Sequence, residues 1–477
     1  MKPTLRLSAL AAVALALTGC ASISIDDALK ETNARSAPFT EGKVELSRTK
    51  EQRDQRAALT SDLLSRPLTQ SDAVQVALAN SPSLQALIAQ SAVNLALANQ
   101  VGRLPNPILS FERVRLNDEL ELGRLLSFGL VDILLFPQRL GLSRSQAEQA
   151  KIQLTGVVID QVTQVKQAWV RAVAAQQALS YAEQVNRSAQ ASAQLARRMQ
   201  LVGNFSKLQR ARQQVFYADA TTDLALARHA VTATREDLVR ILGLDEAQAT
   251  RLTLPARLPD LPKAPRDPQE VSKTAAQQRL DVQLARSQLD LVGRAQGFNL
   301  LGTFIDVEVG ARRDTVFDNA EGTQSTGRGF ELDIRLPLFD WGGARRDLFS
   351  AQTLAAANRY DATVRGASSQ LREGYSAYRT SYDVARHYRD EIVPLRQAIA
   401  DENMLRYNGM FIGVFELLAE ARAQVTSVRR AIDAQHQFWL ADASLAAAVI
   451  GRPGGAVPAM ASGAAPAPAA AAAGAAH

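Results

Sequence analysis

Residues 305–311 read IDVEVGA and residues 330–336 read FELDIRL, and in both stretches apolar side chains alternate with charged or small ones. Such a two-residue period predicts β-strands with one apolar and one polar face. Four strands are expected in all, at about 108–116, 125–136, 303–312 and 328–338. The links at about 117–124 and 313–327 are rich in Asp, Asn, Gly, Thr and Arg and are expected to be outward-facing loops.

Four strands cannot close a barrel within one chain, and open strand edges are not tolerated in lipid. Three chains that contribute four strands each would close a transmembrane barrel of about twelve strands. A soluble sandwich, the alternative for alternating strands, needs more strands than the chain supplies. In the barrel, Asp306, Glu308, Asp333 and Arg335 are expected to face a watery lumen. The side chains expected to face lipid are Ile305, Val307, Val309, Phe330, Leu332 and Ile334.

The strands belong to a pattern that occurs twice, about 205 residues apart. VGNF (202–205) returns as NGMF (408–411), and ILGL (241–244) returns as VIG (449–451). Matches in the same order at the same spacing indicate a tandem duplication. The expected organisation is a signal peptide (1–19), a lipid-anchored tether (20–67), a first repeat (68–252), a linker (253–267), a second repeat (268–452) and a disordered Ala/Pro-rich tail (453–477).

Long helices make up the rest of each repeat. Between Gln138 and Leu254 there is no proline, which predicts a long helix that does not kink. Each long helix is expected to end at a glycine, Gly203 or Gly409, where a left-handed turn starts a returning helix. Pro394 is expected to kink the second long helix. The expected helices are about 138–202 and 206–242 in the first repeat, and about 343–408 and 414–450 in the second.

Apolar side chains recur along these helices at spacings of three and four, for example at Val158, Val162, Val165 and Trp169. This spacing is typical of one face of a packed helix or of a coiled-coil seam. Short connections make the paired helices antiparallel hairpins. Their apolar stripes are too extensive for one chain to bury, which indicates a homo-oligomer.

The start of the chain has a basic segment, an apolar run over residues 7–17 and the quartet LTGC (17–20). This order is typical of a secretory signal peptide, and a run of about 11 residues is too short to span a bilayer. The quartet resembles the lipobox of bacterial lipoproteins, which implies acylation of Cys20, the only cysteine. Ala21 follows it in place of an inner-membrane retention signal, so the outer membrane is the expected location.

The composition argues against several functional classes. The 54 basic and 48 acidic residues are interleaved and form no patch with aromatic residues, so no nucleic-acid partner is expected. The four histidines lack metal-ligand spacing and there is no phosphate-binding loop, so we expect no enzyme, no metal and no other cofactor. No stretch after the signal approaches about 18 uninterrupted apolar residues, so no helical membrane span is expected.

The lipobox, the duplicated hairpin units and the stretch LPLFDWGG (336–343) resemble the outer membrane factor family typified by TolC. The resemblance covers about residues 68–452. It implies a mainly α fold with a small β part, in which a trimeric twelve-stranded barrel stands on a periplasmic helical tunnel. It also implies a passive efflux channel for metal ions or drugs. Its partners would be outer-membrane lipid, a periplasmic adaptor protein and an inner-membrane pump, here expected to be proton-driven.

The family resemblance also implies a gate, because carboxylates after the second hairpin turn help to hold the periplasmic tip shut. The matching carboxylates here are Glu416 and Glu420, which share one helix face, although Phe415 occupies a position often held by Asp. Lys207 and Arg210 stand at the equivalent height of the first hairpin. Pairs between these groups are expected to favour the closed tip. The alternative is that all four are solvated charges.

Two other functions remain open at this point. A duct for type I protein secretion would have the same architecture, and the charge of the lumen does not identify the cargo. A non-transporting periplasmic coiled-coil lipoprotein would explain the helices and would leave the alternating strands without a role.

Overall fold

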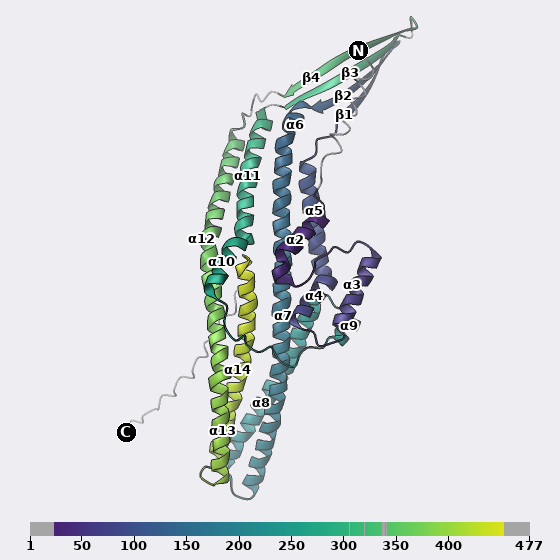
Figure 1. Ribbon diagram of the computed structural model, residues 1–477. Coiled ribbons are helices and arrows are strands. Elements are labelled where there is room, and N and C mark those ends of the chain that lie inside the picture. The colour runs from purple at the N-terminus through teal and green to yellow at the C-terminus, as the bar shows by residue number, and fades with distance from the viewer. Residues whose placement is uncertain (1–22, 305, 319, 336–338, 340, 453–477) are drawn as a thin grey trace, which may run out of the picture.

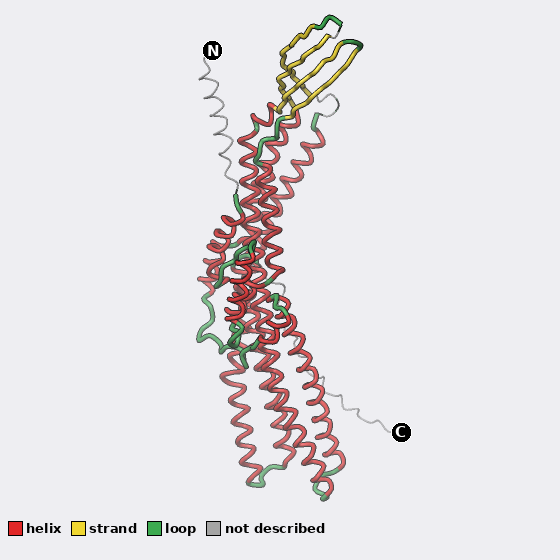
Figure 2. Tube along the Cα trace, turned by 90° about the vertical axis from the view of Figure 1, so that its right-hand side faces the viewer, coloured by secondary structure: helices red, strands yellow, loops and turns green. Residues whose placement is uncertain are grey.

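The computed structural model describes residues 23–304, 306–318, 320–335, 339 and 341–452. The described chain is elongated, with a β-sheet at one end and the tips of two helical hairpins at the other (Figure 1, Figure 2). Short helices thicken its middle. The expected fold class, mainly α with a small β part and two long helical hairpins, is confirmed. The calls that fall outside the described residues concern the signal peptide, Cys20, Ile305, residues 336–338 and the tail from 453.

The elements follow the same order in both repeats. Those of the first repeat and the segment before it are α2 (Ile25–Thr40), α3 (Lys50–Leu63), α4 (Gln70–Asn80), α5 (Pro82–Val101), β1 (Ile108–Leu116), β2 (Glu119–Gly129), α6 (Leu130–Leu134), α7 (Phe136–Leu201), α8 (Lys207–Leu242) and α9 (Glu246–Arg251). Those of the second repeat are α10 (Pro268–Gln278), α11 (Leu280–Phe304), β3 (Asp306–Asp318), β4 (Thr323–Arg335), α12 (Gly343–His387), the π-helical η1 (Tyr388–Ile392), α13 (Val393–Asn408) and α14 (Val414–Val449).

The longest element is α7, which runs for 66 residues. At about 1.5 Å per residue it spans roughly 100 Å. It packs against α5 and α11 toward the sheet and against α8 and α14 toward the tips (Figure 1). Val158, Val162, Val165 and Trp169 are all buried, in agreement with the apolar spacing read from the sequence.

The second long helix changes its hydrogen bonding just before Pro394. α12 ends at His387, the π-helical turn spans Tyr388–Ile392 and α13 begins at Val393. Proline has no N–H to donate to the carbonyl four residues earlier, and its ring crowds that carbonyl. A π-helical turn, which bonds five residues apart, accommodates both constraints and lets the helix continue.

The four strands form one antiparallel sheet in the order β1-β2-β3-β4. β2 ends at Gly129, so the strand expected to reach residue 136 is wrong in its last part. Residues 130–134 form the short helix α6 instead. Arg139 Nη1 donates to Asp132 Oδ1 at 2.6 Å and thereby ties α6 to the first turn of α7.

The two expected loops are much shorter than the sequence suggested. β1 and β2 pair up to Leu116 and Glu119, and β3 and β4 pair up to Asp318 and Thr323. Most of the polar residues expected in loops are therefore paired strand. Asn117 adopts φ 52, a left-handed conformation that lets two residues connect the strands of a tight hairpin.

The segment before the first repeat contains more helix than expected, because a tether with one short helix was expected over residues 20–67 and the described part holds two helices. α2 and α3 contain 16 and 14 residues and begin at the capping side chains of Ser24 and Thr49. Ala28, Leu29 and Phe39 are at most 5% exposed and join the main apolar core. Burial of this apolar surface holds the segment on the long helices.

The linker between the repeats wraps around the bundle (Figure 1). Tyr382 donates its hydroxyl to the carbonyl of Pro262 at 3.0 Å, and Trp439 Nε1 donates to the carbonyl of Pro259 at 3.0 Å. Tyr382 and Phe438 are buried in a second apolar cluster between α12 and α14. The linker thus covers the aromatic cluster that holds the second hairpin together.

Among the helices that the structure describes, none combines the length and the apolar character that a membrane span requires.

Candidate functional site: the sheet faces and the hairpin tips

The register divides the sheet into two chemically different faces. Opposed residues on neighbouring antiparallel strands point to the same side, and successive residues point to opposite sides. Val307 lies opposite Ile334 on what we call the apolar face, and Glu308 lies opposite Asp333 on what we call the acidic face. The apolar face also carries the exposed side chains of Leu109, Phe111, Leu126, Phe128, Phe330 and Leu332.

The residues predicted to line a lumen share one face. The backbone register pairs Asp306 with Arg335 and Glu308 with Asp333, so all four occupy positions of the acidic face. The residues predicted to face lipid occupy the apolar face, with Ile305 outside the described residues.

The centre of the acidic face is Arg312, which sequence reasoning missed. Its guanidinium lies 2.8 Å from Asp314 Oδ2, 3.7 Å from Glu331 Oε2 and 3.8 Å from Glu112 Oε2. These acids come from three different strands. Glu112 and Glu331 are distant from Arg312 in the sequence, so only the strand register shows that they meet it.

Both predicted tip glycines lie in the hairpin turns, but only one is left-handed. Gly203 has φ +81, whereas Gly409 has the ordinary value of −80. Met410 takes the left-handed conformation in the second turn, with φ 62. Gly409 is needed there for a different reason, because a Cβ at this position would lie 2.8 Å from the ring of Phe411.

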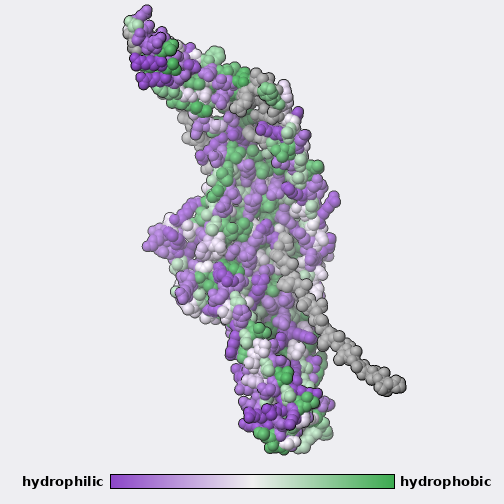
Figure 3. All heavy atoms as spheres, turned by 180° about the vertical axis from the view of Figure 1, so that it is seen from behind, coloured by the Kyte–Doolittle hydropathy of each residue, from purple (hydrophilic) through white to green (hydrophobic). Residues whose placement is uncertain are grey.

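The tips are exposed and partly apolar. Leu201 is 79% exposed, Met410 93% and Phe411 85%. In Figure 3 the lower end of the molecule shows hydrophobic atoms beside hydrophilic ones. An isolated chain therefore leaves apolar surface uncovered where the two hairpins turn.

The candidate gate residues are Lys207, Arg210, Glu416 and Glu420. Arg210 Nη1 donates to Gln200 Oε1 at 2.9 Å, within the first hairpin. Arg396 Nη1 donates to Glu420 Oε1 at 2.9 Å, within the second hairpin. Lys207 and Glu416 are exposed. Two of the four charges thus bond inside their own hairpins, and the cross-hairpin pairs expected from the sequence stay a prediction about the assembled protein.

Other residues join the two hairpins near the tips. The rings of Phe205 and Phe415 lie 4.7 Å apart. Arg422 Nη2 donates to Gln213 Oε1 at 2.9 Å, and its guanidinium lies 4.5 Å from the ring centre of Phe216. Phe415 is the residue that stands where the family resemblance predicted an acid, and that departure was the one sequence signal for an apolar contact here.

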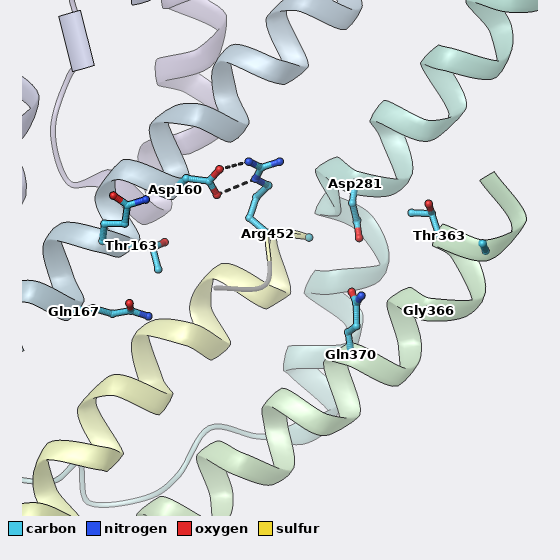
Figure 4. Close-up of a pocket in the computed structure, with 11 residues that line it drawn as sticks. Asp160, Thr163, Gln167, Asp281, Thr363, Gly366, Gln370 and Arg452 are labelled. Carbon is cyan, nitrogen blue, oxygen red and sulfur yellow. Dashed lines mark hydrogen bonds and ion pairs between the residues drawn. The ribbon is translucent and has the colours of Figure 1, made fainter. Parts of the chain in front are cut away.

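A polar cavity of about 710 Å³ lies where the two repeats meet (Figure 4). Arg452, just after α14, donates from Nε to Asp160 Oδ1 of α7 at 2.9 Å and makes a second bond to the same carboxylate. Gln370 of α12 and Asp281 of α11 line the opposite side. The Arg452 ion pair thus fastens the end of the second repeat to the long helix of the first.

Equivalent glycines end the return helices of both repeats. Gly243 and Gly451 have φ of 69 and 79. A Cβ on Gly243 would lie 2.4 Å from Pro82 Cδ, and one on Gly451 would lie 2.3 Å from Asp281 Oδ1. In each repeat the glycine therefore permits close packing on the start of the neighbouring helix, α5 or α11.

Several titratable groups are buried in the middle of the molecule. Burial, assisted by Arg171, lowers the pKa of His436 to about 4. Burial also raises the pKa of Asp442, although Arg266 lies 2.8 Å away and opposes the shift. Among the described residues, no group of three or more His, Cys, Asp or Glu side chains is arranged to hold a metal ion.

No protein-family model matches the sequence, and no curated protein matches it either. Solved structures do match it in fold. The CmeC outer membrane channel of Campylobacter jejuni is 13% identical, with a TM-score of 0.66, and the match covers 88% of this chain and 92% of that one. The open-state MtrE outer membrane channel of Neisseria gonorrhoeae is 18% identical, with a TM-score of 0.64, covering 79% and 87%.

A third solved structure is that of CusC, described for its folding and transmembrane channel formation. It is 17% identical, with a TM-score of 0.65, and the match covers 83% of this chain and 92% of that one. The three matches cover 79–88% of this chain and 87–92% of the solved channels. The chain therefore has the fold of the outer membrane channel proteins.

Proposed function

We propose that this protein is the outer-membrane channel of a tripartite efflux system and that it belongs to the TolC-like outer membrane factors. Three copies assemble into a twelve-stranded barrel that continues into a helical tunnel. The channel conducts small solutes passively, and an inner-membrane pump supplies the energy through a periplasmic adaptor protein. Acylated Cys20 anchors each copy to the outer membrane.

The observation that carries this proposal is the open sheet with one apolar face. β1 and β4 each pair with a single strand, so both edges of the sheet carry unpaired backbone groups. An open edge is not tolerated in lipid, and beside an exposed apolar face it promotes aggregation in water. Joining β4 of one copy to β1 of the next satisfies both edges, and three copies bring twelve strands into a closed barrel.

The helical part supports the same assembly. The hairpins leave large apolar side chains exposed along their length, among them Val215 at 59% and Leu226 at 63%. Neighbouring copies in a tunnel would cover this surface. With α7 alone spanning roughly 100 Å, the tunnel is long enough to reach well into the periplasm. The alternative function, a non-transporting coiled-coil lipoprotein that acts as a periplasmic spacer, would use the helices alone and would leave the sheet without a role.

The acidic face suggests the ion preference of the pore. When the apolar face turns toward lipid, the acidic face turns toward the lumen. Its acids include Glu308, Asp314, Glu331 and Asp333, and Arg312 and Arg335 offset only part of their charge. An acidic lumen attracts cations and repels anions. We therefore expect a cation-preferring channel, whatever the exported cargo.

The decisive experiment is to measure the mass of the detergent-solubilised protein together with its single-channel conductance in planar bilayers. The proposal predicts trimers and a small conductance with cation preference. Replacing Glu308 and Asp333 by Gln should shift the reversal potential toward anions while the trimer persists. Replacing the exposed Glu236 and Glu402 of the hairpins by Gln removes the same charge outside the barrel and outside the proposed gate, and is the matched control.

Monomers without conductance would refute the barrel and favour the coiled-coil spacer. Trimers whose ion preference does not respond to the Glu308 and Asp333 changes would show that the acidic face does not line the pore. Conductance that rises after charge reversal at Lys207 and Arg210 would support the proposed cross-hairpin gate, and unchanged conductance would refute it.

A further inference from the structure

Five arginines stand on the apolar face of the sheet, and the proposed function does not use them. They are Arg113 and Arg115 of β1, Arg124 of β2, Arg313 of β3 and Arg328 of β4. Arg124 lies directly opposite Arg313, and Arg313 lies directly opposite Arg328, so three of them form a row across neighbouring strands. All five are exposed. The row is a band of positive charge on a face that is apolar on the side of the helices and mixed on the side of the hairpin turns, where Thr315 lies between Leu122 and Thr326.

The acids of the sheet cannot neutralise this band, because they all stand on the other face. Glu112 has the opposite side-chain direction to Arg113, and Glu331 has the opposite direction to Arg328. No described acid of the four strands occupies the apolar face. Arg312 belongs to the acidic face and has three carboxylates within 4 Å.

The five arginines of the apolar face, in contrast, make no side-chain hydrogen bond or ion pair with any residue that the structure describes. Like charges directly opposite each other in a sheet destabilise it. The row therefore needs anions from outside the chain. Bidentate bonds to phosphate are the interaction for which the planar guanidinium group is best suited.

The position of the row along the strands indicates where those anions would be. From Ile334 to Arg328 the strand advances six residues, which is about 20 Å along the strand and roughly 15 Å of height at the usual tilt. The exposed Phe339 and Trp341 extend the apolar band further toward the helices. Figure 3 shows the sheet mainly hydrophilic toward its free end and more hydrophobic where it meets the helices. The row thus borders the apolar band on the side of the hairpin turns.

Arginine on the lipid-facing side of a barrel is costly at the bilayer centre and nearly neutral at the interface. The row is therefore at the depth of headgroups. We propose that Arg124, Arg313 and Arg328, assisted by Arg113 and Arg115, bind the phosphate groups of a phosphorylated glycolipid in the outer leaflet of the membrane around the barrel. This inference rests on the proposed function, because it requires the apolar face to turn toward lipid and the hairpin turns toward the outside.

Native mass spectrometry of the purified protein in detergent tests the inference, with bisphosphorylated lipid A, monophosphoryl lipid A and phosphatidylcholine added in separate arms. The wild-type trimer should retain bisphosphorylated lipid A at least tenfold more strongly than phosphatidylcholine, with the monophosphoryl form between them. Changing Arg124, Arg313 and Arg328 together to Gln should weaken the retention of lipid A at least tenfold and leave that of phosphatidylcholine unchanged.

The matched control changes the exposed Arg187, Arg197 and Arg228 to Gln, which removes the same charge from α7 and α8. It should retain lipid A like the wild type. A second variant, with Lys at positions 124, 313 and 328, keeps the charge, and it should lose only the part of the binding that depends on the guanidinium fork. It also supplies a folded variant if the Gln protein does not assemble.

Each outcome separates the inference from the proposed function, because trimer mass and bound lipid appear in the same spectrum. Monomers in the wild-type spectrum would refute the proposed assembly itself. Wild-type trimers that retain the three lipids equally would overturn the lipid inference alone. The same conclusion would follow if the control variant lost lipid A as strongly as the Gln variant of the row, since binding would then reflect net charge.

Discussion

Changing Gly243 to Ala should loosen the joint between the return helix of the first repeat and the start of α5. Gly243 has φ +69, and a Cβ there would lie 2.4 Å from Pro82 Cδ and 2.8 Å from Ser81 Cα. The second neighbour is backbone, so relief requires a shift of α5. The matched control is Gly203→Ala, because Gly203 has φ +81 and no atom within 4 Å of the added Cβ.

Both substitutions place an alanine in a left-handed backbone conformation, but only Gly243→Ala also overpacks its neighbours. Alanine in a left-handed conformation costs about 1–2 kcal/mol at either position. Gly243→Ala adds the cost of overpacking, typically about 1–3 kcal/mol. The total is roughly 2–5 kcal/mol at Gly243 and about 1–2 kcal/mol at Gly203. The difference corresponds to a change of about 5- to 150-fold in the equilibrium constant for local opening.

Hydrogen exchange followed by mass spectrometry on the solubilised protein measures that local opening. Peptides that cover residues 77–88 and 236–248 should exchange faster in Gly243→Ala than in the wild type, and this acceleration should exceed that of the tip peptides in Gly203→Ala by about the factor above. In Gly203→Ala the peptides around Gly243 should exchange as in the wild type, and faster exchange should be confined to the hairpin tip. If the acceleration around Gly243 in Gly243→Ala were no larger than the acceleration at the tip in Gly203→Ala, the packing argument would be refuted, since only the backbone term would then matter.

Three further predictions follow from single contacts. Because the pKa of His436 falls from about 6.5 in the unfolded chain to about 4 in the folded one, the stability that its neutral form contributes is complete above pH 6.5 and is lost as the pH falls toward 4. The loss is on the order of 3 kcal/mol, so His436→Leu should flatten the fall in Tm over this range. Phe415→Ala removes the ring contact with Phe205 and should cost about 1 kcal/mol of stability beyond the lost burial. It should also raise single-channel conductance. An unchanged conductance would contradict a role for this contact in closing the tip. Arg429→Met breaks a 2.6 Å pair with Asp223 whose side chains are 58% and 49% exposed. It should change stability by less than about 1 kcal/mol in thermal unfolding, and a larger loss would mean that assembly buries the pair.

Much of the tertiary fold could be read from local patterns. The absence of proline after Gln138 and the apolar spacing from Val158 onward predicted α7 within two residues at each end. The alternation around Val307 predicted a strand and which of its side chains share a face. Such patterns repeat with the period of the element, so a short stretch is enough to reveal them.

The candidate site was less predictable, because it depends on contacts between distant residues. The sequence suggested a pair between Arg210 and Glu420 only because both stand at the same height along the two hairpins. In the single chain each of them bonds within its own hairpin. Arg312 and the arginine row require the strand register before their neighbours are known. The polar residues near Asn117 suggested a loop. A strand whose polar side chains face water contains the same types of residue as a loop, so composition alone does not distinguish the two.

The sequence by itself determined the long hairpins, their duplication and the two faces of the strands, since helix propensity, proline and side-chain periodicity act over a few residues. Only the tertiary structure decided that residues 25–63 pack on the long helices, that Phe205 meets Phe415, and that Arg124, Arg313 and Arg328 stand side by side. These contacts join segments far apart in the chain. Their free energy comes from apolar burial and strand pairing, which depend on the position of the partner in space.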